Sequence, residues 1–208
     1  MENNPCLSDY VASKRISRKI LSLVKETRGE PSLTSRYYEW DSKRLYFDYD
    51  VEVVRKEFVE GHSSGVYVSA SAGVSEDWDD ADELSFEIDV DPRREPQCYQ
   101  DMSSLLVEVI SHEIEHLIQG HGTNYREGRC TDKSGQGETW FKYYARPSEV
   151  EAYVAGFRAM ARHRKVSVST VMSEEIEHMK SILKMTDEET SVVFSRWTDY
   201  LTRRYLHL

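Results

Sequence analysis

The sequence predicts an α+β fold, with a small mixed sheet and one central helix followed by a helical lobe. In the first half, Tyr, Val, Phe and Ile occur in alternating or β-rich runs between turn-forming residues. In the second half, apolar residues recur at helical spacing. Strands that are followed by a central helix and then by a helical lobe indicate an α+β arrangement. We expect one domain over residues 1–208, with lobes of about 1–97 and about 98–208.

The first lobe should open with an amphipathic helix over residues 10–28. Its apolar side carries Ile16, Ile20 and Leu23, basic residues occupy the rest, and Gly29 and Pro31 end it. Packing of this helix on its own domain is favoured over the alternative, docking to an acidic partner. Three or four strands should follow, over residues 37–40, 44–54, 66–72 and 84–90.

The second lobe should contain only helices and loops. Thr186 and Glu189 have the spacing of a capping box, which predicts a helix start at Asp187. The other helices are expected over residues 101–119, from Pro147 to about His163, and over residues 170–185.

Residues 112–116 read His-Glu-Ile-Glu-His, an HExxH motif within the predicted helix 101–119. Histidines at i and i+4 of a helix lie one turn apart on the same face, so His112 and His116 can bind one metal ion, normally zinc. Glu113 is rotated away from that position but can hydrogen-bond a water held by the metal, as a general base does.

The faces of this helix support the metal interpretation. His112 and His116 share a strip with Leu105 and Val109, apart from both the apolar face and the polar face, as expected of a helix that lines a cleft. The apolar face consists of Leu106, Val107, Ile110, Ile114, Leu117 and Ile118, and the polar face of Glu108, Ser111, Glu115 and Gln119. Gly120 and Gly122 should end the helix.

A catalytic zinc needs a third protein ligand, and the helix after Pro147 offers two glutamates. Glu151 shares a face with Arg158 and Arg162, which favours a solvated charge pair. Glu149 lies on a side rich in small residues, where the helix can approach another closely. We therefore expect His112, His116 and Glu149 as the zinc ligands.

With these residues the sequence resembles the gluzincin metallopeptidases, and among them small metallopeptidases encoded by tailed bacteriophages. In gluzincins an HExxH helix supplies two histidines and a later helix supplies a glutamate, often in an E-x-x-A pattern, here Glu149 to Ala152. The resemblance implies a minimal zincin-like domain that binds one Zn²⁺ and hydrolyses peptide bonds. Tyr153 departs from the family, which usually has Asp or Asn at that position, so the group that orients the ligands is open.

The expected mechanism is zinc-assisted peptide hydrolysis. Zinc lowers the pKa of a bound water from about 15.7 toward roughly 7, and Glu113 accepts its proton. Tyr143, Tyr144, Arg146 and His121 are candidate donors to the oxyanion, and Tyr144 is our choice. If the strand containing Phe86, Ile88 and Val90 is a sheet edge, a substrate peptide could add to it as an antiparallel strand.

Other metal sites fit less well. A metzincin requires Gly and His where this chain has Gln119 and Gly122. A di-iron helical bundle could use the ExxH motifs that end at His116 and His178, but the apolar stripe of helix 170–185 places His178 on its solvated side. A calcium loop at Asp77 lacks the glycine and the third ligand of an EF-hand. A non-catalytic, metal-stabilised binding or virion protein is the main alternative function.

Composition excludes several partners. The formal net charge of −10, from 27 Lys and Arg against 37 Asp and Glu, argues against nucleic acid. The chain has no long apolar run and its first residues form no apolar signal, so we expect no membrane partner and a cytoplasmic protein, in the host cytoplasm or the phage particle. Cys6, Cys98 and Cys130 lack paired spacing and should be reduced thiols.

Overall fold

The computed structural model describes residues 5–28, 33–41, 46–58, 65–73, 81–95, 97–121 and 139–205. They form a mixed α+β structure, as predicted, within two compact units, Met1–Leu117 and Ile118–Leu208. The division falls inside a helix, well after the predicted boundary near residue 98. Most of the HExxH helix thus belongs to the unit that contains the sheet.

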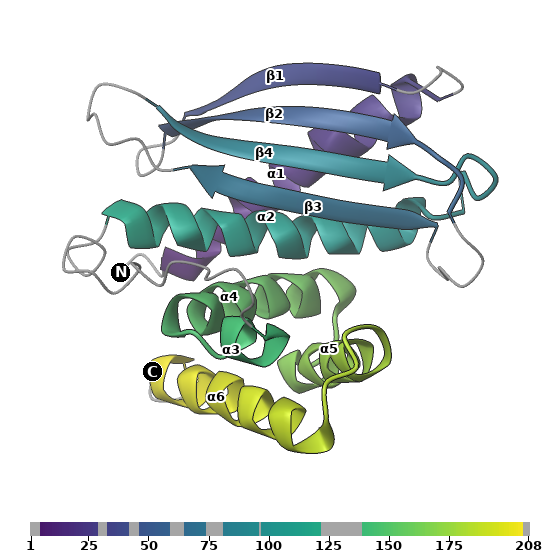
Figure 1. The fold of residues 1–208 in the computed structure, drawn as a ribbon. Coiled ribbons are helices and arrows are strands. Elements are labelled where there is room, and N and C mark those ends of the chain that lie inside the picture. The colour runs from purple at the N-terminus through teal and green to yellow at the C-terminus, as the bar shows by residue number, and fades with distance from the viewer. Residues whose placement is uncertain are drawn as a thin grey trace. The chain divides into compact units, whose positions relative to one another are not determined.

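The first unit contains a four-stranded sheet and two long helices (Figure 1). Its strands are in the order β1-β2-β4-β3, with β2 and β4 parallel and the two outer pairs antiparallel. The elements are α1 (Pro5–Glu26), β1 (Leu33–Asp41), β2 (Tyr46–Arg55), β3 (Val66–Gly73), β4 (Asp82–Val90) and α2 (Tyr99–His121). The strand predictions are therefore correct in number and close in extent.

The hypothesis that residues 84–90 form a sheet edge is wrong. Strand β4 pairs with β2 on one side and with β3 on the other, so β1 and β3 are the edges among the described strands. A peptide cannot add to a strand whose two hydrogen-bonding edges are already occupied. Strand β4 is internal because the chain passes from β2 to the outer strand β3 before it returns between them.

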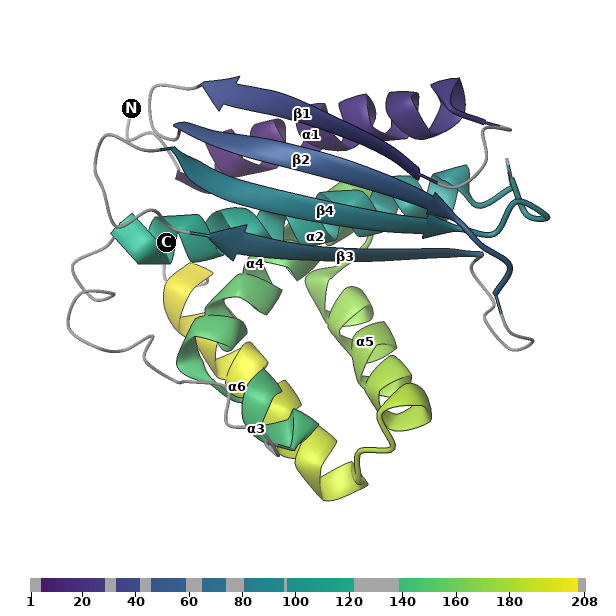
Figure 2. The ribbon, with the colours of Figure 1, turned by 45° about the horizontal axis from the view of Figure 1, so that its top comes forward.

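Helices α1 and α2 cover the same face of the sheet (Figures 1 and 2). Phe47, Val51, Phe86 and Ile88 point to this face and are almost completely buried. The alternate residues of the same strands lie on the other face, which neither α1 nor α2 covers. The alternation of buried and exposed side chains along β2 and β4 follows from this one-sided packing.

A buried ion pair joins the end of β2 to the turn that follows β4. Nε of Arg55 lies 3.3 Å from the Glu95 carboxylate, and both side chains are at most 6% exposed. At the end of α1, Arg55 also donates to the carbonyl of Val24 at 2.8 Å and to the Thr27 hydroxyl at 3.2 Å. The bond to Val24 satisfies a carbonyl group that the end of a helix leaves without an intrahelical donor.

The second unit is a helical lobe with an aromatic core. Trp197 and Phe157 are fully buried at its centre, with ring centroids 4.8 Å apart. Its helices are α3 (Trp140–Tyr144), α4 (Pro147–Arg164), α5 (Val168–Ile182) and α6 (Asp187–Tyr205). The capping box is confirmed, since the backbone N–H of Thr186 donates to the Glu189 carboxylate and that of Glu189 donates to the Thr186 hydroxyl. Across the described helices, none combines the length and apolarity needed to cross a bilayer.

Candidate metal centre

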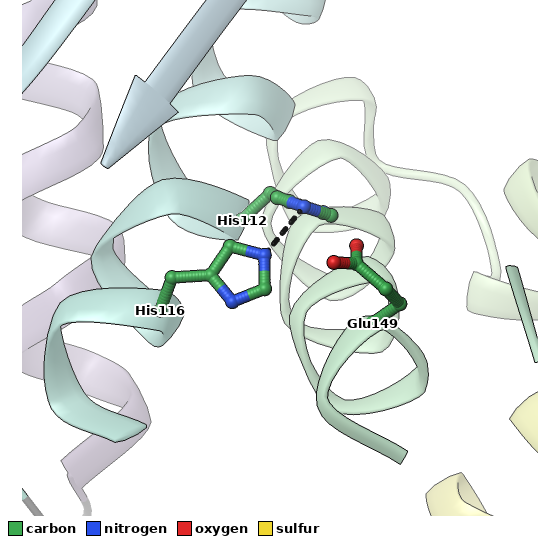
Figure 3. A group of neighbouring side chains, drawn as sticks. All are labelled: His112, His116 and Glu149. Atoms are coloured by element: carbon green, nitrogen blue, oxygen red, sulfur yellow. Dashed lines mark hydrogen bonds between the residues drawn. The ribbon is translucent and has the colours of Figure 1, made fainter. Parts of the chain in front are cut away.

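Two histidines of α2 direct the same ring nitrogen toward one point. The Nε2 atoms of His112 and His116 lie 3.1 Å apart, and the ring planes are inclined by 78° (Figure 3). His112 is 8% exposed and His116 is half-buried. Two imidazole nitrogens this close must either share a proton or face a common cation, because two bare lone pairs repel.

Glu113 is buried beside this pair. Its side chain is about one-tenth exposed, and one carboxylate oxygen lies 4.0 Å from Nε2 of His112. That separation is too long for a hydrogen bond but allows one water molecule to bridge the two groups. The role of Glu113 as a general base stays a prediction, and this separation is compatible with it.

The helix behind these residues is fixed by α1. The hydroxyl of Ser111 donates to that of Ser13 at 2.7 Å, and both residues are buried. Ser111, which was predicted on the polar face of its helix, is buried, because α1 packs against that side of α2. The two hydroxyl groups satisfy each other, so their burial costs little. Helix α2 also continues through Gly120 to His121 instead of ending there.

The first turn of α4 carries both candidate glutamates. Pro147 occupies the first helical position and Arg146 is the N-cap residue, as the sequence predicts. Glu149 is buried, 8% exposed, whereas Glu151 is half-buried. A carboxylate near a helix N-terminus is stabilised there by the helix dipole, which lowers the cost of burying Glu149.

The last turn of α2, which belongs to the second unit, is bonded to this part of α4. The Gln119 amide donates to the carbonyl of Ser148 at 3.0 Å and to the Glu151 carboxylate at 3.4 Å. Gln119 follows His116 by three residues in one helix, and Ser148 directly precedes Glu149. Figure 3 draws His112, His116 and Glu149, whose ligand atoms lie within 4.8 Å of one another.

Sequence reasoning missed the role of Gln119. It was assigned only to the polar face of its helix, although its amide reaches the backbone before Glu149. The sequence did contain a signal for this contact. Gln119 follows the second histidine by three residues, on the side of the helix next to the histidine strip. The choice of Glu149 over Glu151 as third ligand agrees with the burial of the two side chains and stays a prediction.

The tyrosines near Glu149 form an aromatic cluster within the second unit. The ring of Tyr144 lies 4.9 Å from that of Tyr153 and 5.4 Å from that of Tyr143. Burial raises the pKa of Tyr153 well above its usual value, and a hydrogen bond with Tyr144 and the charge of Glu149 add to this. Tyr153, one turn after Glu149, thus lies near the Glu149 carboxylate.

The residues of the alternative di-iron site do not join the candidate metal ligands. His178 is exposed and Glu175 is half-buried on α5, and neither belongs to the group of His112, His116 and Glu149. The predicted apolar stripe of α5 is confirmed by the burial of Met172, Ile176 and Met179. Cys98 is buried and free, and burial raises the pKa of its thiol. Asp77, Asp79 and Cys130, with the side chains of His121 and Cys6, lie outside the described residues.

Comparison with known proteins gives no functional assignment for this chain. No family model, curated protein or solved structure matches this chain.

Proposed function

We propose that this protein is a zinc-dependent metallopeptidase of the gluzincin type. The observation that carries the proposal is the convergence on α2 of the His112 and His116 Nε2 atoms, 3.1 Å apart, with the Glu113 carboxylate 4.0 Å from the first of them. All three groups come from one helix of one unit. Their arrangement therefore follows directly from the spacing of the motif.

The donor set suits zinc. Two nitrogen ligands at 2.0–2.1 Å from a tetrahedral zinc lie roughly 3.3 Å apart, close to the 3.1 Å between the two histidine nitrogens. Two imidazoles and a carboxylate are the ligand types of known catalytic zinc sites, which keep a fourth position open. Glu149 is the proposed third ligand, supported by its burial and by the Gln119 bond to the preceding residue.

The proposed chemistry divides between metal and protein. When bound, zinc supplies Lewis acidity, which lowers the pKa of a water and polarises a carbonyl group. Glu113 accepts the proton of the attacking water and passes it to the leaving amine. Tyr144 is the proposed donor to the oxyanion, supported by its position beside Tyr153 and near α4.

The alternative, a metal-stabilised protein without peptidase activity, uses the same ligands. The two functions differ in whether zinc confers hydrolysis. To test this, the protein is first treated with a chelator and then titrated with zinc. Three quantities are measured at each step: the bound metal, the melting temperature and the cleavage of an unfolded protein substrate. We expect one equivalent of zinc to raise the melting temperature and to start cleavage. Stoichiometric, stabilising zinc without cleavage of any peptide in a broad library would instead establish the non-catalytic alternative.

A further inference from the structure

The uncovered face of the sheet carries rows of directly opposed carboxylates. In the pairing register, Asp48 of β2 lies between Glu39 of β1 and Glu83 of β4. Glu52 of β2 faces Glu87 of β4 in the same way. Like charges that are directly opposite on neighbouring strands destabilise a sheet. The fold tolerates this repulsion on the one face that neither α1 nor α2 covers.

None of the residues that the described strands place on this face is Lys or Arg. Lys56, directly after β2, pairs with Asp89 at 2.6 Å and also interacts with Glu87. Three exposed tyrosines, Tyr37, Tyr46 and Tyr67, border the acidic rows. Tyrosine is enriched on surfaces that bind another protein.

Of the two helices on the other side of the sheet, α1 has a basic solvent side. It buries its apolar side against the sheet, and its solvent side carries Arg15, Arg18, Lys19 and Lys25 with the half-buried Lys14. Glu26 on this side is already paired with Arg36, at 3.7 Å. The exposed Val11 lies at the N-terminal end of the same stripe. The first unit therefore has a cationic helix on one side of its sheet and an anionic sheet face on the other.

We propose that the anionic face of the sheet binds the cationic side of α1 from a second copy of this protein. The charged stretches are comparable in length, since the helix from Lys14 to Lys25 rises about 17 Å and the strand from Asp48 to Glu52 extends about 13 Å. They lie on opposite sides of the unit, so a two-fold dimer would bring like charges together. The contact is head-to-tail, and it produces rings or open chains of copies.

Salt should control this association. At about 0.15 M salt the Debye length is roughly 8 Å, so the net negative charges of two copies are largely screened while touching charges are not. At about 1 M salt the length falls to roughly 3 Å, and the contact should dissociate. An interface of one helix on one sheet face is smaller than a standard stable interface, so a weak complex is expected.

Two variants with complementary defects test the proposal. Glu52→Gln, Glu83→Gln and Glu87→Gln together neutralise the sheet face, and Arg15→Glu with Arg18→Glu reverses the charge of the helix side. In sedimentation experiments at up to about 1 mM protein, the wild type should associate and each variant alone should have at least a ten-fold lower association constant. Their equimolar mixture should form a one-to-one complex that grows no further, because only one matched pair of surfaces remains.

A control variant separates the surface from net charge. Glu177→Gln, Glu188→Gln and Asp199→Asn remove three negative charges from the second unit and should associate like the wild type. A second experiment uses only the wild type, so it does not depend on the folding of a variant. Isotopically labelled and unlabelled chains are mixed and coupled with a carbodiimide. The coupling should join Lys14, Lys19 or Lys25 of one copy to carboxylates on the sheet face of another. The proposal would be overturned if the wild type stays monomeric, or if the mixture of the two variants forms no complex. It would also be overturned if the control variant loses as much association as the sheet variant, or if coupling joins other residues.

Discussion

Nε2 of His112 and Nε2 of His116 lie 3.1 Å apart on successive turns of α2. The backbone of one helix is enough to produce this spacing, and the Ser13–Ser111 hydrogen bond fixes that helix against α1. In the proposed metal site, the helix itself would therefore hold two of the ligands in place. Binding then costs little conformational entropy, which favours high affinity.

The third ligand can be identified by comparing the two glutamates of α4. Glu149→Gln should weaken zinc binding by more than about 100-fold, because loss of a direct ligand exceeds the 10–100-fold effect of an outer partner. Glu151→Gln is the matched control, since an amide oxygen can still accept from Gln119. Competition titration with a chromogenic chelator measures both. Equal losses of zinc affinity in the two variants, or a larger loss in Glu151→Gln, would contradict the assignment of Glu149 as the third ligand.

The oxyanion donor can be tested at Tyr144. Tyr144→Phe should lower kcat by about 10²–10³, as for loss of one oxyanion donor, while zinc content stays at the wild-type level. Tyr143→Phe serves as the comparison, because its ring belongs to the same cluster. Steady-state kinetics with metal analysis separates the two effects. A larger kcat loss at Tyr143 would transfer the role to that residue.

Loss of one partner of the buried Arg55–Glu95 ion pair should destabilise the fold more than loss of both. Arg55→Leu leaves the Glu95 carboxylate buried without its cation, which should cost about 3–5 kcal/mol of unfolding free energy. The double variant Arg55→Leu, Glu95→Leu removes that lone charge and should be more stable than the single variant. Urea denaturation of the three proteins measures this. A double variant that is no more stable than Arg55→Leu would contradict this prediction.

Asp91 should make stability depend on pH in the acid range. Hydrogen bonds from the Arg93 side chain, at 2.7 and 2.9 Å, hold the pKa of Asp91 well below its ordinary 3.8. Because the folded state binds this proton less readily, the stabilisation is complete above about pH 4–5 and is lost as pH falls through the lowered pKa. The gap in urea midpoint between wild type and Asp91→Asn should therefore be constant near neutrality and shrink below about pH 4. A gap that widens in acid would contradict this.

Local patterns predicted most of the helices and the core of the site. His112, Glu113 and His116 lie in one helix, so their relative positions follow from helical geometry alone. The predicted start at Pro147 and the capping box at Thr186 are equally local, and both are correct. Helix α3 was missed because five residues are too few to show a period.

Features that depend on distant parts of the chain could not be predicted in this way. The alternation in β4 shows that one of its faces is buried, but alternation is the same in an edge and in an internal strand. The burial of Ser111 could not be predicted, because nothing in its own helix reveals that Ser13 packs against it. Gln119 likewise gains its role only when Ser148 is near.

The most direct test of the proposed function is Glu113→Gln, with zinc content and peptide cleavage measured on the same preparation. The substitution keeps the size of the side chain and leaves both histidines in place, so one zinc per chain should remain bound. Cleavage should fall by about 10²–10⁴, the usual contribution of a general base. Full cleavage activity in a variant that retains its zinc would contradict the mechanism proposed for this protein.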